Sequence, residues 1–494
     1  MISIQDVSFS YAGESSDGIH NINLEIQDGQ CVLLCGRSGC GKTTVTRLIN
    51  GLIPYFFSGD LSGKTFVNGR EISETPMYEI AEMVGSVFQN PRTQFFNVDT
   101  DSEIAFGIEN AALPFEELHS RVEQTTKDLH IEDLRARDIF ALSGGEKQKI
   151  AFASVYAMNP DVYLLDEPSS NLDLKTIQEL HDHLKLIKEQ GKTIVIAEHR
   201  IYYLMDLVDR ILFMEDGQIT GDFTPGEFKG LSDTVRKQMG LRAIDLMKIT
   251  SDSAHKTFAD SILTLEDVSL SYKKQSILEH INLQAAGGEV IGIIGQNGAG
   301  KTTFSRGLCG LHKENNGHFE WEGMPSKPKS RLQKSYMVMQ DVNYELFAES
   351  VQAECSFGIK HPDYDLVEQA MDELNLLSYR NRHPKTLSGG QKQRTAAAVS
   401  LICQKELLVF DEPTSGLDFD SMLRLSALIR HLSEKGKLVF VVTHDFEFLT
   451  QVCNRVLCME NHCLLDDFEV CADNLDRLRT ALGFPAGGTK EVVV

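Results

Sequence analysis

The chain of 494 residues carries one series of five short motifs twice, in the same order. The first series is GRSGCGKTT (36–44), a glutamine at 89, LSGGEKQ (142–148), YLLDEP (163–168) and a histidine at 199. The second series is GQNGAGKTT (295–303), a glutamine at 340, LSGGQKQ (387–393), LVFDEP (408–413) and a histidine at 444. A series repeated over so long a chain predicts two domains of roughly 200–250 residues that share one fold.

The spacing of the repeats places the domain boundaries. Lys42 and Lys301 lie 259 residues apart, whereas the LSGG serines, the acidic strands and the histidines each repeat after 245 residues. The first copy therefore has 14 extra residues, the difference of these offsets, between its lysine and its LSGG motif. We predict a first domain over 1–222, a helical tail and linker over 223–260, a second domain over 261–470, and a C-terminal helix and tail over 471–494.

Composition narrows the class of protein. No stretch approaches the ~20 consecutive apolar residues of a membrane helix, and the N-terminal ISIQDVSFSY lacks a signal core, so we expect no secretion. The net charge of −23 makes nucleic acid an unfavourable partner. Ten scattered cysteines suit a reducing compartment, and Cys453 to Cys463 indicate a hairpin around Asn461 and His462 rather than a metal site.

Strand-like and helix-like stretches alternate along the chain, which predicts an α/β fold with largely parallel central strands. CVLLCG (31–36) and EVIGIIG (289–295) each resemble a buried strand that runs into G-x-x-x-x-G-K-T and then a helix. This context is typical of a phosphate-binding loop, in which glycines turn backbone N–H groups toward a phosphate. We predict that Lys42 and Lys301 contact phosphates and that Thr43 and Thr302 bind Mg²⁺.

Two apolar strands end in an Asp-Glu pair. The first carboxylates, Asp166 and Asp411, are predicted to join Thr43 and Thr302 in binding Mg²⁺. The second carboxylates, at 167 and 412, are predicted to polarise an attacking water, and general-base help of this kind contributes roughly 10²–10⁴-fold to a rate. In isolation such a pair is more often a solvated strand end, but here each follows a phosphate loop.

Histidine and glutamine complete the catalytic prediction. His199 and His444 each follow a strand and lie 33 residues beyond the aspartate of their own copy, which favours a contact with a transferred phosphate. Gln89 and Gln340 also end strand-like pieces and are predicted to contact nucleotide and metal. The predicted catalytic residues are Glu167, His199, Glu412 and His444; the predicted metal-binding residues are Thr43, Gln89, Asp166, Thr302, Gln340 and Asp411.

Together these motifs resemble the ATP-binding cassette (ABC) ATPases, over about 1–221 and 261–467. The resemblance implies two tandem P-loop domains, each with a RecA-like core, an antiparallel β subdomain and a helical subdomain that carries LSGG. It also implies that the two cassettes of one chain close head to tail around two ATPs. Glu146 and Asn171 depart from the usual residues, but neither departure removes a catalytic group, so both sites are expected to be competent.

In that arrangement the LSGG motif of one copy completes the site built on the lysine of the other, and an aromatic residue stacks on adenine. The residues predicted to bind ATP are Tyr11, Gly36, Ser38, Gly39, Gly41, Lys42, Thr43, Thr44, Gln89, Ser143, Gly144 and Gly145 in the first copy. In the second copy they are Tyr272, Gly295, Asn297, Gly298, Gly300, Lys301, Thr302, Thr303, Gln340, Ser388, Gly389 and Gly390.

The run FQNPRTQFFNVDTDSEIAFGIEN (88–110) resembles the ATPases of energy-coupling-factor importers. That resemblance implies import of a vitamin, a vitamin precursor, or cobalt or nickel ions. It implies an integral membrane coupling subunit and a substrate-binding membrane subunit as partners, and a peripheral location at the cytoplasmic face of the cell membrane. We expect 94–110 to dock the coupling subunit, so that charge reversal at Glu103 and Glu109 weakens co-purification and leaves nucleotide binding intact. The second copy, QDVNYELFAESVQAECSFG (340–358), departs from the pattern.

Two alternatives stay open at this stage. One is the tandem ATPase of a sugar-type importer, although many of those have one degenerate site and both sites here are intact. The other is a tandem-cassette translation factor that binds ribosomes. Such factors resemble this chain in lacking membrane spans, but they typically carry a long charged linker and have a reason to be basic, whereas this chain is acidic.

Overall fold

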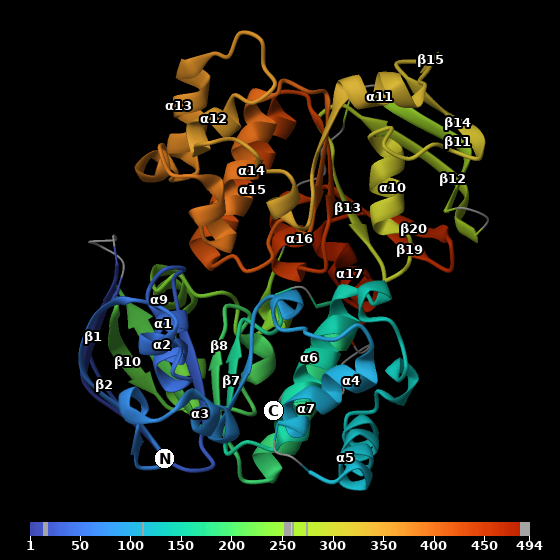
Figure 1. Cartoon of the computed structure of the whole chain (residues 1–494). Helices are drawn as coiled ribbons and strands as arrows, with labels where there is room; N and C mark the ends of the chain where they lie inside the picture. The colour runs from blue at the N-terminus through green and yellow to red at the C-terminus, as the bar shows by residue number, and fades with distance from the viewer. Residues whose placement is uncertain are drawn as a thin grey trace. The chain divides into compact units, whose positions relative to one another are not determined.

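The structure is a computed structural model of the whole chain, and it describes residues 1–12, 18–110, 113–170, 172–250, 258, 261–272 and 275–484. These form two compact units, one over Met1–Ile244 and one that begins at Asp245 (Figure 1). The predicted tail beyond Phe484, part of the predicted linker, and Asn171 lie outside the described residues. Each unit is described below by itself.

The first unit contains ten strands and nine α-helices among its described residues. The strands are β1 (Ile2–Tyr11), β2 (Gly18–Ile26), β3 (Cys31–Gly36), β4 (Gly59–Val67), β5 (Arg70–Glu71), β6 (Val84–Val87), β7 (Val162–Asp166), β8 (Thr193–Ala197), β9 (Arg210–Glu215) and β10 (Gln218–Phe223). The helices are α1 (Lys42–Ile49), α2 (Leu52–Tyr55), α3 (Met77–Met83), α4 (Thr100–Glu109), α5 (Phe115–Asp128), α6 (Gly144–Met158), α7 (Leu174–Glu189), α8 (Pro225–Lys229) and α9 (Asp233–Gln238).

A six-stranded sheet in the order β10-β9-β3-β8-β7-β6 forms the centre of this unit. All its pairs are parallel except β9 with β10 at one edge. Every residue of β3 and β8 is buried, as expected for parallel strands covered on both faces. Because parallel strands align their carboxyl ends, the ends of β3, β7 and β8 deliver the phosphate loop, the Asp-Glu pair and His199 to one edge.

A second sheet is antiparallel, in the order β2-β1-β4-β5. Buried and exposed residues largely alternate along β2, which is the pattern of a sheet with one face on a core and one on solvent. Helix α1 contacts strands of both sheets, so the helix that follows the phosphate loop lies between the two layers. Helices α4 and α5 pack on α6, and these three lie together on one side of the central strands β7 and β8 in Figure 1.

The second unit repeats this plan. Its strands are β11 (Ser261–Tyr272), β12 (Gln275–Ala286), β13 (Val290–Ile294), β14 (Asn316–Trp321), β15 (Met324–Pro325), β16 (Ser335–Val338), β17 (Leu407–Asp411), β18 (Leu438–Val442), β19 (Arg455–Glu460) and β20 (Cys463–Glu469). Its helices are α10 (Lys301–Leu308), α11 (Pro328–Lys334), α12 (Val351–Cys355), α13 (Tyr364–Glu373), α14 (Gly389–Ile402), α15 (Phe419–Glu434), α16 (Phe446–Val452) and α17 (Leu475–Leu482).

The sheets of the second unit have the orders β20-β19-β13-β18-β17-β16 and β12-β11-β14-β15. These match, strand for strand, the two sheets of the first unit. The α/β prediction is confirmed in both units. The predicted hairpin is also confirmed, since β19 and β20 pair antiparallel around Asn461 and His462, which both have positive φ. The longest helices, α7 and α15, have 16 residues each, and no helix in the described ranges combines the length and apolar character that crossing a membrane requires.

Candidate functional site

The two phosphate loops require glycine where each leaves its strand. Gly36 and Gly295 have φ of 143° and 148°. A Cβ on Gly36 would lie 2.2 Å from the carbonyl oxygen of Met214, and one on Gly295 would lie 2.1 Å from that of Met459. No larger residue fits this close approach of two backbones. Ser38, Gly39, Asn297 and Gly298 then lie in the turns that follow.

Each loop ends at a helix N-terminus. Helices α1 and α10 begin at Lys42 and Lys301, after Gly41 and Gly300, and neither helix has a side-chain cap. The first N–H groups of an uncapped helix are donors without an intrahelical partner, and they suit an anion. Thr44 and Thr303 lie in the first turn of these helices.

The loop lysines lie across their own loops. Lys42 Nζ donates to the carbonyl oxygens of Gly36 and Arg37, both at 3.0 Å. Lys301 Nζ donates to those of Gly295 and Gln296, at 2.6 and 3.0 Å. Both lysines are buried. A buried ammonium group held by the carbonyl oxygens of its own loop, beside an uncapped helix N-terminus, fits the phosphates of a nucleotide.

A hydroxyl and a carboxylate meet behind each loop. Thr43 Oγ1 donates to Asp166 Oδ1 at 3.2 Å, and Thr302 Oγ1 donates to Asp411 Oδ2 at 3.2 Å. Burial, followed by the charge of Glu167, raises the pKa of Asp166 to about 6, and burial also raises the pKa of Asp411. This all-oxygen donor set fits Mg²⁺, whose charge would favour the ionised carboxylate.

The Asp-Glu pairs place their glutamates beside the histidines. Glu167 Oε2 accepts a hydrogen bond from Gln89 Nε2 at 2.5 Å, and Glu167 Oε1 lies 3.4 Å from His199 Nε2. Among the described residues no group hydrogen-bonds to this buried Nε2. A buried polar atom without a partner is rare, and this nitrogen is available to bond an oxygen of a ligand. In the second unit His444 Nε2 lies 3.5 Å from Glu412 Oε1.

The conformation of these two glutamates could not be expected from the sequence. Glu167 and Glu412 have φ of 45° and 47°, in the left-handed region that costs a residue other than glycine about 1–3 kcal/mol. The N–H of each is held by a strand carbonyl, of Ala197 at 2.8 Å and of Val442 at 2.8 Å. Strained residues of this kind cluster at functional sites, where the surrounding structure fixes a side-chain direction.

The LSGG serines begin helices. Ser143 caps α6 by accepting from the Glu146 N–H, while Glu146 accepts from the Ser143 N–H, and Ser388 and Gln391 repeat this capping box at α14. A Cβ on Gly144 or on the equivalent Gly389 would meet nothing within 4 Å. Gly145 and Gly390 follow in the first turn. That these motifs complete the opposite site stays a prediction.

The two predicted adenine-stacking residues have different surroundings. Tyr11 accepts a hydrogen bond from Arg47 at 2.8 Å, lies 3.1 Å from Thr44 Oγ1, and packs edge-on against Phe9. Tyr272 is 62% exposed and stacks on His312 with ring centroids 6.5 Å apart. The structure thus ties Tyr11 to the helix after the phosphate loop and leaves one face of Tyr272 to solvent. Stacking on adenine stays a prediction for both.

Sequence reasoning missed two groups of residues in the first unit. Arg37 Nη1 pairs with Glu215 Oε1 at 3.1 Å, and Arg37 Nη2 donates to the Gln238 carbonyl at 2.6 Å, which links the phosphate loop to the end of α9. The second unit has Gln296 at the position of Arg37. No local pattern signals a bond between residues 201 positions apart.

The second missed group flanks His199. Glu198 is buried, and its Oε2 accepts from the Ser169 N–H at 3.2 Å and from the Tyr203 hydroxyl at 3.1 Å. Arg200 Nη1 donates to the Leu172 carbonyl at 3.3 Å. Both residues therefore hold the loop after the Asp-Glu pair. The second copy has Thr443 and Asp445 at these positions, a departure that was visible in the sequence.

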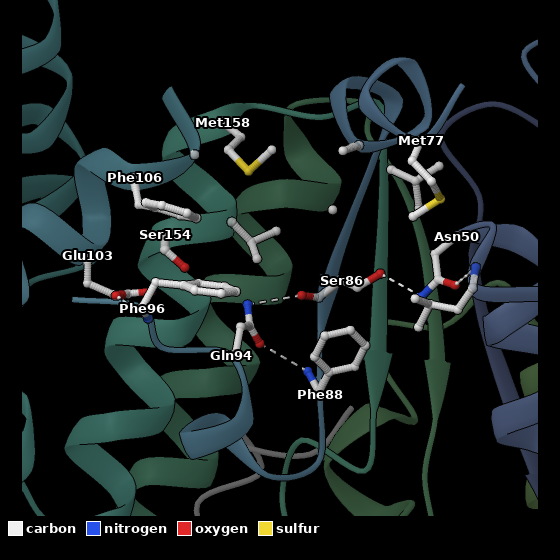
Figure 2. Close-up of a pocket in the computed structure, with 16 residues that line it drawn as sticks. Asn50, Met77, Ser86, Phe88, Gln94, Phe96, Glu103, Phe106, Ser154 and Met158 are labelled. Carbon is white, nitrogen blue, oxygen red and sulfur yellow. Dashed lines mark hydrogen bonds between the residues drawn. The ribbon is translucent and has the colours of Figure 1, made fainter. Parts of the chain in front are cut away.

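A pocket of about 230 Å³ opens in the first unit between α3, α4, α6 and the end of β6. Figure 2 shows its aromatic and thioether side chains, among them Phe96, Phe106 and Met158. Phe96 and Phe106 stack with centroids 4.9 Å apart, and Phe96 is 73% exposed. Gln94 lies at the base of the pocket, where its side chain bonds to the Phe88 N–H at 3.3 Å and to the Ser86 carbonyl at 3.1 Å.

Glu103 has a structural role in this pocket. Its carboxylate is buried and accepts from the N–H groups of Phe96 and Asn97, at 3.0 and 2.8 Å. Charge reversal at Glu103 would therefore disturb the loop that carries Phe96, so this residue is not a suitable test of direct contact with a partner. Glu109 is exposed at the end of α4.

Comparison with known proteins matches the motifs described above. The model of the ABC transporter family matches residues 19–170 and 278–415. A protein of Treponema denticola that carries the name ABC transporter ATP-binding protein is 49% identical over 488 residues, covering 98% of this chain and 99% of its own length. A protein of the same name from Methanosarcina mazei is 32% identical and covers 94% of this chain and 88% of its own.

Among solved structures, a model of ribosome-bound archaeal Pelota and ABCE1 has a TM-score of 0.72 with 22% identity. The match covers 96% of this chain and 80% of that chain. At this identity the likeness concerns the fold alone.

Proposed function

The chain belongs to the ABC transporter family, with two tandem cassettes, and on that premise we propose that it powers import of a micronutrient through a separate membrane complex. One observation carries the proposal. Gln89 bonds to the glutamate at the hydrolytic site, and Gln94, five residues later, forms the base of the apolar pocket. A single short loop thus connects the nucleotide site with a surface suited to a membrane partner.

We propose the following roles at the nucleotide. Lys42 and Lys301 bind the phosphates of ATP, and Thr43, Asp166 and their counterparts hold Mg²⁺, which when bound offsets phosphate charge. Glu167 and Glu412 orient a water and draw on its proton, and His199 and His444 bind the terminal phosphate through Nε2. The backbone of each glutamate is strained and held by a strand carbonyl, and its carboxylate lies beside the histidine of its own copy.

We propose that the two cassettes of one chain close around two ATPs, with the LSGG motif of each on the nucleotide of the other. A helix N-terminus with a serine hydroxyl suits a terminal phosphate. One chain would then serve one complex, at the cytoplasmic face of the membrane. Fusion fixes the pairing of the two cassettes at high effective concentration.

The pocket of the first unit is proposed to hold a helical segment of the integral coupling subunit. Its wall is apolar and aromatic, and an exposed phenylalanine pair of this kind suits insertion of apolar side chains from one face of a helix. Vitamins, vitamin precursors, and cobalt or nickel ions are the proposed cargo class, because the run over 88–110 resembles that of energy-coupling-factor ATPases. A second, substrate-binding membrane subunit would select the cargo.

The docking proposal is tested with Phe96→Ser. Co-purification of membrane subunits in detergent should fall at least about tenfold, because the variant removes an exposed aromatic anchor. Phe115→Ser is the matched control, since Phe115 is 81% exposed on α5 and does not line the pocket. Nucleotide binding should be unchanged in both variants. Equal co-purification of the two variants would contradict the proposed docking site.

The transport proposal is tested by identifying what purifies with the intact chain. Mass spectrometry of a detergent pull-down should find integral membrane proteins and a bound small molecule or metal ion. Reconstituted vesicles should then take up that compound only with ATP. Sedimentation with ribosomes at low salt, without membrane proteins, would instead overturn the importer assignment.

A further inference from the structure

Glu345 of the second unit occupies the position of Gln94 in the first. Each follows the glutamine of its own copy, Gln340 or Gln89, by five residues. Each accepts a hydrogen bond from the first N–H after its strand: Gln94 Oε1 from Phe88 at 3.3 Å and Glu345 Oε1 from Met339 at 2.5 Å. The two side chains therefore anchor equivalent loops to equivalent strands.

The other end of the two side chains differs. Gln94 Nε2 donates to the Ser86 carbonyl at 3.1 Å. The residue equivalent to Ser86 is Met337, two positions before Met339. Glu345 Oε2 is buried, and within the described part of the chain it has no hydrogen-bond partner. An ionised carboxylate has no proton to donate to a carbonyl, whereas a protonated carboxyl can act as an amide does.

The groups around Glu345 favour the neutral form. Burial comes first, and Asp411 at the end of β17, Glu354 on α12 and Asp341 in the same loop add negative charge; together they raise the pKa of Glu345 to about 8. The Met339 N–H acts in the opposite sense.

Two further titratable groups lie on the neighbouring elements. Tyr336 on β16 has a raised pKa, chiefly through burial. Helix α14 supplies the cation Lys392, whose Nζ donates to Asn343 Oδ1 at 2.9 Å. The charges that act on Glu345 are therefore mainly negative, and each of them disfavours a second carboxylate.

We propose that Glu345 is a positioning residue that stays protonated at neutral pH and donates its Oε2 hydrogen to the Met337 carbonyl. The proton makes the carboxyl equivalent to the amide of Gln94. Glu345 then holds the loop that begins at Gln340 through two hydrogen bonds, one accepted by Oε1 from the Met339 N–H and one donated by Oε2 to the Met337 carbonyl. When the pH rises and the proton is lost, Oε2 and the Met337 carbonyl oxygen are both acceptors. They can no longer form a hydrogen bond, and the loop loses that anchor. The second cassette thus carries a pH-sensitive anchor where the first carries a permanent one, and this inference does not depend on the proposed transport function.

The test compares the full-length chain with Glu345→Gln, which copies the first cassette, and with Glu345→Ala. In the intact protein, an infrared band of a protonated carboxylic acid should be present at neutral pH and disappear with a midpoint near the pKa given above. The contribution of Glu345 is the part of the band that is missing from Glu345→Gln, in which the other carboxyl groups are unchanged. Absence of that contribution at neutral pH in the intact protein would overturn the proposal.

Hydrogen exchange at the amides of residues 344 and 345, which bond to the Asp341 and Val342 carbonyls within the loop, supplies a second readout. After correction for intrinsic exchange, protection in the intact protein should fall about tenfold across the same pH range, the effect of losing roughly one hydrogen bond. Glu345→Gln should keep high protection throughout, and Glu345→Ala should have low protection throughout. A merely space-filling role predicts the same pH response in the intact protein and in Glu345→Gln, and that result would also overturn the proposal.

Discussion

The two cassettes agree closely where they handle nucleotide and differ where they anchor their loops. The threonine–aspartate distance is 3.2 Å in both, and the glutamate–histidine distances are 3.4 and 3.5 Å. By contrast Arg37, Gln94 and Arg200 have Gln296, Glu345 and Asp445 as counterparts. The two copies thus share one geometry at the residues predicted to catalyse hydrolysis and differ at the residues that anchor the neighbouring loops.

The largest expected effect comes from replacing the proposed general base of each site. Glu167→Gln and Glu412→Gln together should lower steady-state ATP hydrolysis by about 10²–10⁴-fold, because an amide cannot take a proton from water. Similar geometry predicts similar losses for the two single variants. Turnover should be measured in the assembled complex. A single variant with undiminished turnover would show that its glutamate is not the base, and unequal losses would show that the sites have diverged.

The next test concerns the backbone of the phosphate loops. Gly36→Ala and Gly295→Ala should each destabilise their unit by about 3 kcal/mol and abolish nucleotide binding there, because the new Cβ would meet a carbonyl oxygen at 2.2 or 2.1 Å. Gly39→Ala is the matched control, since its Cβ would meet nothing within 4 Å and only its φ of 83° is strained. Thermal unfolding and nucleotide titration distinguish the two kinds of variant. Equal effects at Gly36 and Gly39 would contradict the steric explanation.

The pH dependence of stability should separate the two units. A carboxyl group whose folded pKa is raised binds its proton more tightly when folded, so its contribution to stability is complete below the unfolded pKa and is lost as pH rises through the folded value. For Glu345 this window runs from about 4.5 to about 8. The free energy of unfolding, measured with denaturant, should therefore be compared between the intact chain and Glu345→Gln. The value for the intact chain minus that for the variant should decline over this pH range. A flat difference would contradict the assignment.

The smallest expected effect concerns the loop after the first Asp-Glu pair. Arg200→Ala should slow hydrolysis only several-fold, since it removes hydrogen bonds of about 1 kcal/mol each to the Ser169 and Leu172 carbonyls. Asp445→Ala, at the equivalent position, removes instead the N-cap of α16, whose side chain accepts from the Phe448 N–H. The first should alter turnover more than stability, and the second should do the reverse. Measuring both quantities for both variants checks the difference.

The sequence predicted what depends on short segments. Strand, glycine loop and helix follow one another directly, so the phosphate loop could be placed without tertiary information. The LSGG serine at a helix start follows the same logic, because Ser143 and Glu146 form a capping box at fixed spacing. The fold class followed from the alternation of strands and helices.

Features that depend on distant contacts were not predictable. The left-handed φ of Glu167 is supported by a carbonyl of β8, 30 residues later. Glu103 looked like an exposed acidic residue until its backbone partners were known. The anchor at Glu345 depends on a buried oxygen that no spacing reveals. In each case local sequence allows several conformations, and packing selects one.

The bond from Arg37 to the Gln238 carbonyl joins two parts of the first unit that are distant in the sequence. Gln238 lies six residues before Ile244, where the first unit ends. A guanidinium group therefore ties the last part of the first unit to the loop that is predicted to bind phosphate. The second unit has glutamine at position 296, so its equivalent loop lacks that arginine.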